Sequence, residues 1–83
     1  MPMSNQSLLD ALQLARDGDW DAAHEIVQDL QSADAARIHG YLHRVEGDNG
    51  NARYWYNRAG VDFPNVSIEQ EWEQTFAELS GGP

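Results

Sequence analysis

Two Gly-Asp turns that lie 29 residues apart constrain the fold of this chain more than any other feature of its sequence. Gly18-Asp19 and Gly47-Asp48 each separate two stretches in which apolar residues recur at helical spacing. Glycine accepts the left-handed conformation that ends many helices, and aspartate can cap the helix that follows. The repeated turn therefore predicts two similar helical hairpins, over residues 7–31 and 34–60.

The remaining chain predicts one further helix and no strand. Pro64 disfavours a helix over residues 61–66, so this range is expected to be a loop. Ser67 and Gln70 have the spacing of a capping box, which predicts that the last helix spans 67–79. No segment alternates apolar and polar residues with a period of two. We therefore expect a single all-α domain of about five helices, in which a C-terminal helix covers two antiparallel hairpins. The expected N-caps are Ser7, Asp19, Asp34, Asp48 and Ser67.

Composition limits the classes of function. The chain has 14 acidic residues, five arginines, no lysine and a formal net charge of −9. A nucleic-acid partner is not expected, because cations that neutralise phosphates supply most of the non-specific affinity. The absence of cysteine excludes disulfides and thiolate sites. No stretch approaches the roughly 20 apolar residues of a membrane span, and the first residues lack the pattern of a signal peptide. We expect a cytoplasmic protein with no membrane contact.

Small and aromatic residues in the second hairpin resemble those of tetratricopeptide and Sel1-like repeats. The resemblance rests on Gly40, Gly47-Asp48, Ala52, Tyr56 and Ala59, and the first hairpin repeats it more weakly. It implies stacked helical hairpins whose first helices line a concave ligand groove, followed by a solvating helix. Residues 41–60 are also similar to a block found in small bacterial proteins of unassigned function, a similarity that implies no activity.

The second hairpin concentrates the cations. Residues 35–60 contain four of the five arginines and only two carboxylates. The repeat resemblance implies that Arg37, Tyr41 and Arg44 line the groove, where arginine offers a planar fork of donors to a carboxylate or phosphate. The implied ligand is an acidic peptide, a protein or a small anion. The alternative is that Arg37 and Arg44 pair with some of the 14 acidic residues, for which the acidic face of the last helix, with Glu69, Glu71, Glu73 and Glu78, is one candidate.

Three neighbouring aromatic residues are expected to divide between two faces. Trp55 and Tyr56 are expected in the core. Tyr54 points away with Arg53 and Arg58, and this cationic and aromatic surface is expected to contact a partner or a second copy of the chain. A solvated face with no partner is the alternative.

Two histidines suggest a different kind of site. His39, His43 and Glu46 have the spacing i, i+4 and i+7, which could present two imidazoles and a carboxylate to one metal ion. His24 would lie near His43 if the hairpins pack antiparallel. The favoured interpretation is that the histidines are partly buried against neighbouring helices and form hydrogen bonds to Glu46, Glu25 or a tyrosine hydroxyl.

No catalytic constellation or cofactor motif is found, so neither enzymatic activity nor a cofactor is expected. The serines are cap or terminal residues without a nearby base, and residues 46–51 lack the Lys-Ser/Thr ending and the preceding strand of a phosphate loop. The predicted function is a small binding or scaffold module. Alternatives are a homodimeric assembly protein and a His/Glu metal-binding protein. The candidate binding residues are Arg37, His39, Tyr41, His43, Arg44, Arg53, Tyr54 and Arg58.

Overall fold

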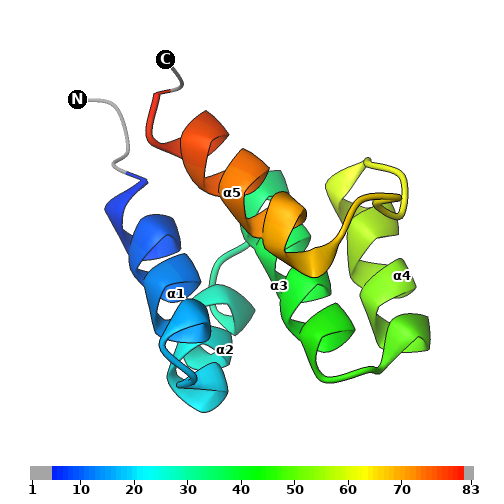
Figure 1. Ribbon diagram of the computed structural model, residues 1–83, viewed down its shortest axis with the longest axis horizontal. Helices are drawn as coiled ribbons and strands as arrows, with labels where there is room; N and C mark the ends of the chain where they lie inside the picture. The colour runs from blue at the N-terminus through cyan, green and yellow to red at the C-terminus, as the bar shows by residue number, and fades with distance from the viewer. Residues whose placement is uncertain (1–4, 82–83) are drawn as a thin grey trace.

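The computed structural model describes residues 5–81 and confirms the all-α fold, with five helices in that range (Figure 1). No helix in this range has both the length and the apolar character that crossing a membrane requires. The helices are α1 (Gln6–Arg16), α2 (Trp20–Gln28), α3 (Ala33–Val45), α4 (Asn49–Ala59) and α5 (Ile68–Leu79).

The two Gly-Asp turns have the same backbone geometry. Gly18 and Gly47 both have positive φ, +91° and +86°. The amide of Asp19 donates to the carbonyl of Leu14 at 2.8 Å, and the amide of Asp48 donates to that of His43 at 2.9 Å. Each aspartate side chain then accepts from a backbone amide in the first turn of the next helix. The predicted turn is confirmed in both hairpins.

A single glycine lets the second hairpin close tightly. A Cβ atom on Gly40 of α3 would lie 3.0 Å from Cδ1 of Tyr56 and 3.1 Å from the carbonyl oxygen of Ala52, both on α4. These contacts are shorter than side chains normally tolerate, so only glycine permits this approach. Tyr56 and Ala52 are buried as a result.

The central helix of the fold is α3, which contacts each of the other four. Eight of its 13 residues are buried. The core between the helices includes Leu8, Leu12, Val27, Ile38 and Leu42. Because α3 has so many neighbours, its buried residues include the polar side chains of His39 and His43.

The last helix lies over the first helices of both hairpins. α5 packs on α1 and α3 (Figure 1), where the Trp72 indole donates to the carbonyl of Leu12 at 2.7 Å. The predicted capping box of Ser67 and Gln70 is present at its start. This placement puts α5 on the face that the repeat resemblance assigns to a ligand groove.

Helix starts differ from the sequence prediction at two places. Ser32, not Asp34, caps α3, and its hydroxyl accepts from the amide of Ala35 at 3.1 Å. Asn5, not Ser7, is the N-cap residue of α1. Serine, asparagine and aspartate all favour this position, and apolar spacing alone does not distinguish between candidates two residues apart.

Candidate functional site

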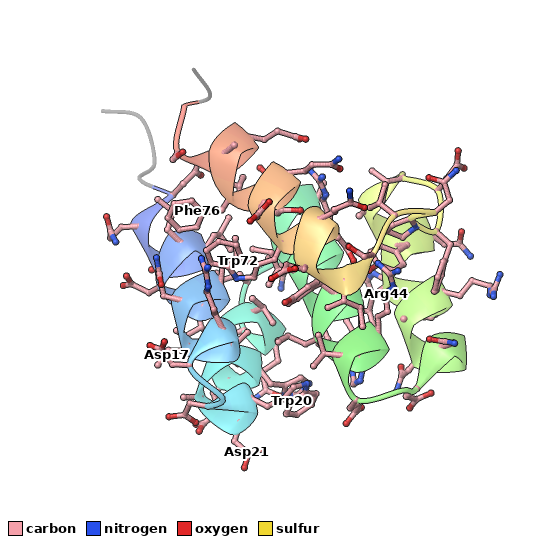
Figure 2. All side chains as sticks on the ribbon, in the orientation of Figure 1. Asp17, Trp20, Asp21, Arg44, Trp72 and Phe76 are labelled. Carbon is pink, nitrogen blue, oxygen red and sulfur yellow. The ribbon has the colours of Figure 1, made fainter. Side chains whose placement is uncertain are left out.

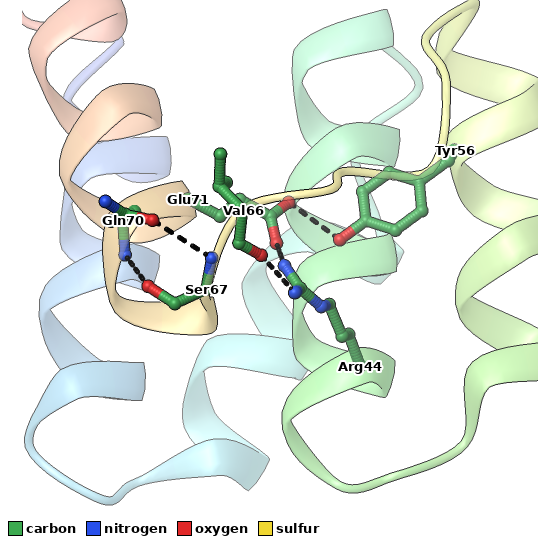
Figure 3. Close-up of polar contacts among 6 residues, drawn as sticks. All are labelled: Arg44, Tyr56, Val66, Ser67, Gln70 and Glu71. Atoms are coloured by element: carbon green, nitrogen blue, oxygen red, sulfur yellow. Dashed lines mark hydrogen bonds and ion pairs between the residues drawn. The ribbon is translucent and has the colours of Figure 1, made fainter.

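The arginines predicted to line the groove are paired with α5. Arg37 donates to Glu78 at 2.8 Å, and Arg44 donates to Glu71 at 2.8 Å. Arg44 also donates to the backbone carbonyl of Val66 in the loop before α5 (Figure 3). The pairing with the last helix, given above as the alternative, is therefore the arrangement that the structure shows.

Glu71 is the buried centre of this contact. Its side chain is 3% exposed and accepts from both Arg44 and the hydroxyl of Tyr56, the latter at 2.7 Å (Figure 3). Burial and the hydrogen bond to Glu71 raise the pKa of Tyr56 above its usual range. Tyr41 is also buried, and burial raises its pKa. The α5 helix thus packs on the part of α3 that carries Arg37, Tyr41 and Arg44.

The other predicted cations lie on the outer surface of α4. Arg58 donates to the Tyr54 hydroxyl at 3.2 Å, and its guanidinium carbon lies 5.2 Å from the centre of the Trp55 ring. Arg53 lies over Phe63 at 5.1 Å. Tyr54 is 52% exposed, as predicted. Neither arginine forms an ion pair with a carboxylate of the described residues.

Three histidines meet where the two hairpins pack together. His24 comes from α2, while His39 and His43 lie one turn apart on α3. Their ring centres are separated by 4.6 Å for His24 and His39, 5.0 Å for His39 and His43, and 5.5 Å for His24 and His43. One ring nitrogen from each lies within 4.8 Å of the others. We call these three residues the histidine cluster.

Two tryptophan rings stack on imidazoles of the histidine cluster. Trp55 of α4 stacks on His39 with ring centres 3.8 Å apart and planes inclined by 8°. Trp20 stacks on His24 at 4.8 Å. Trp20 lies between α2 and α3 (Figure 2), where its indole donates to the carbonyl of Leu42 at 2.7 Å. The imidazoles of His24 and His39 are thus each held against an indole face.

Burial lowers the pKa values of two of the three imidazoles, His24 and His39. His39 is 5% exposed, and desolvation together with the neighbouring imidazoles lowers its pKa to about 4. Burial, followed by the effect of His43, also lowers the pKa of His24. Neutral imidazole has a ring nitrogen with a free lone pair. Among the described residues, neither His24 nor His39 has a hydrogen-bond partner for its ring nitrogens.

Glu46 orients the third imidazole. Nδ1 of His43 lies 2.7 Å from a carboxylate oxygen of Glu46. When His43 is neutral, this contact requires a proton on Nδ1, because a carboxylate can only accept, and it leaves the lone pair on Nε2. Of the three partners expected for the histidines, Glu46 is the one that His43 contacts.

The ligand set differs from the one the spacing suggested. Glu46 does not join His39 and His43 in one group; His24 takes that place, and Glu46 instead groups with His43 and Asp48. The proximity of His24 to His43 was expected from antiparallel packing.

The role of Trp20 was not predicted, although Trp20 lies one helical turn before His24 and on the same face of α2. Trp55 was expected in the core, but it is half-buried against His39.

The arrangement defines a class of protein: a five-helix, all-α domain with an imidazole cluster between two hairpins. Comparison of the chain with protein-family models, with curated proteins and with solved structures returned no match.

Proposed function

We propose that this protein is a small helical binding module whose ligand site is the histidine cluster. The observation that carries this proposal is the set of three imidazole nitrogens within 4.8 Å of one another, two of them on rings without a hydrogen-bond partner in the described chain. Ring nitrogens that have no partner within the protein are free to bind a ligand. The resemblance to tetratricopeptide repeats, which form binding surfaces, agrees with this proposal.

The chemistry of the cluster favours an electron-pair acceptor as its ligand. Burial lowers the pKa values of His24 and His39, so these two imidazoles favour the neutral form, which presents a lone pair and no positive charge. An anion would gain little from them. A cation or a strong hydrogen-bond donor would gain most, because both interact directly with the lone pairs.

The test replaces the imidazole of His39 and measures the free energy of unfolding of the ligand-free protein. If the nitrogens serve a ligand, at least one of His39→Leu and His39→Phe should be as stable as the parent, because the substitution removes no hydrogen bond among the described residues. Urea unfolding followed by circular dichroism at pH 7.5 gives this comparison.

Tyr56→Phe is the matched control for this experiment. It also removes a polar atom from a buried aromatic ring, but its hydroxyl is bonded to Glu71, so we expect a loss of about 1 kcal/mol. If both His39 variants lose more than about 1 kcal/mol as well, the imidazole is a structural group and the proposed function is wrong.

The outer surface of α4 is a second candidate site. Arg53 and Arg58 lie against aromatic rings and have no carboxylate partner within residues 5–81, although the chain has 14 acidic residues. They suit an acidic peptide or protein, a small anion, or an acidic face of a second copy. A labelled poly-glutamate peptide should bind at low salt, and Arg53→Gln with Arg58→Gln should abolish binding. Arg16→Gln, an arginine over Trp72 on another face, is the control.

A further inference from the structure

We infer that the histidine cluster binds one divalent transition-metal ion, with His24, His39 and His43 as its ligands. This inference rests on the proposed function and names the ligand of that same site. Three imidazoles form a donor set that suits zinc, copper, nickel or cobalt, whereas magnesium and calcium prefer oxygen ligands. The two histidines of α3 have the i, i+4 spacing by which one helix can chelate an ion.

The distances fit such an ion after small side-chain movements. The candidate nitrogens lie within 4.8 Å of one another. Zinc–nitrogen bonds of about 2.0–2.1 Å in a tetrahedral site place the ligand nitrogens about 3.3 Å apart. Rotation of the imidazoles about their side-chain bonds can supply this contraction without moving the helices. His24 belongs to the first hairpin and the other two ligands to the second, so the ion would join the two hairpins.

The contact between His43 and Glu46 has the geometry found around metal-binding histidines. Histidines that bind metals usually donate their other ring proton to a carboxylate or carbonyl. Glu46 accepts from Nδ1 of His43 at 2.7 Å in this way, which leaves Nε2 for the ion. Glu46 is therefore a positioning residue.

Three protein ligands leave one coordination position for water or another small ligand. His24 is only half-buried, whereas His39 and His43 are buried. The ion would therefore reach the cluster from the side of His24. The alternative group of His43, Glu46 and Asp48 would require His43 to give up its bond to Glu46 or to turn its ring.

The test is a titration of untagged protein, freed of metal with a chelator, with ZnCl2 by calorimetry and with Co2+ by visible absorption. We expect one ion per chain and the absorption of tetrahedral cobalt. Glu46→Gln should lower the affinity about 10- to 100-fold, the usual effect of losing an outer partner of a ligand. Each of His24→Gln, His39→Gln and His43→Gln removes a ligand and should lower it further.

Asp48→Ser is the matched control. Serine keeps an N-cap for α4 but removes the carboxylate of the alternative group, so the affinity should not change. Circular dichroism checks the fold of each variant, and His24→Gln provides a ligand variant at a half-buried position in case His39→Gln does not fold.

Two results would overturn the inference: no binding of Zn2+, Co2+, Ni2+ or Cu2+, or binding that survives His24→Gln and is lost in Asp48→Ser. The stability experiment separates this failure from that of the proposed function. If no ion binds but a His39→Leu or His39→Phe variant keeps its stability, the site serves another ligand. If both variants are destabilised, the cluster is structural and both proposals fail.

Discussion

Replacing Glu71 by alanine would leave the guanidinium of Arg44 without its counter-charge in a mostly buried position. The two side chains are 3% and 14% exposed and are joined at 2.8 Å. Removing one partner of a buried pair costs about 3–5 kcal/mol, because the other charge stays buried and unpaired. A domain of 83 residues unfolds with about 4–12 kcal/mol in total. Glu71→Ala should therefore remove a large part of the stability of this protein.

The chain contains its own control for this prediction. Arg37 and Glu78 also connect α3 to α5 at 2.8 Å, but the Glu78 side chain is 60% exposed. An exposed pair contributes at most about 1 kcal/mol, so Glu78→Ala should be nearly neutral. The two variants remove the same chemical group from the same helix and differ mainly in burial.

Urea unfolding followed by circular dichroism measures both variants. With a slope of about 1 kcal/mol per molar urea for a small domain, Glu71→Ala should lower the midpoint by roughly 3 M or more. The triple variant Arg44→Met, Tyr56→Phe, Glu71→Leu should recover much of the loss, because it leaves neither an unpaired charge nor a Tyr56 hydroxyl without its acceptor. A loss below about 1 kcal/mol for Glu71→Ala would show that water solvates Arg44, and the reasoning from burial would then be wrong.

Three further predictions use the same unfolding assay. Gly40→Ala should destabilise the protein by about 1–3 kcal/mol, since its Cβ would meet Tyr56 at 3.0 Å, whereas Gly50→Ala, with no contact closer than 4.0 Å, should not. Thr75→Val should raise stability by up to about 1 kcal/mol, because the hydroxyl of Thr75 is buried without a partner among the described residues; a loss would mean that a water satisfies it. The metal-free protein should lose about 2 kcal/mol between pH 7.5 and 5.0, because the unfolded chain binds a proton near pH 6.5 that folded His39, with a pKa of about 4, does not. His39→Phe should weaken this pH dependence. His24 contributes in the same direction, because its pKa is lowered as well. The variant keeps the other titratable groups near the site, Glu46, Asp48 and His43.

The local features of the fold were predictable from sequence because they depend on neighbouring residues. The left-handed glycines at 18 and 47 and the capping box at Ser67 follow from short motifs with a direct physical cause. Gly40 was identified as a small residue of the repeat resemblance, and the close approach of α4 to it is seen only in the structure. Helix starts were less well determined, since Ser32 and Asp34 are both competent caps.

The candidate site depended on packing that sequence patterns do not determine. Arg44 could be assigned to a carboxylate of the last helix, but choosing Glu71 requires knowing that α5 lies over α1 and α3. The periodicity of a helix gives its buried face and not the direction in which it crosses its neighbours. The contribution of His24 followed from antiparallel hairpins, whereas the stacking of Trp20 and Trp55 on imidazoles depends on the register of three helices.

The position of α5 brings the two ends of the described chain together. The side-chain amide of Asn5 donates to the carbonyl of Leu79 at 2.9 Å. Figure 1 shows that the start of α1 lies next to the end of α5. A short linker could therefore join the ends, and a new start could be made between Val61 and Asp62, two exposed loop residues. In such a circular permutant α5 would be synthesised first and the hairpins afterwards, with every helix contact retained. The order in which this protein's helices emerge during translation is thus separable from the architecture that they build.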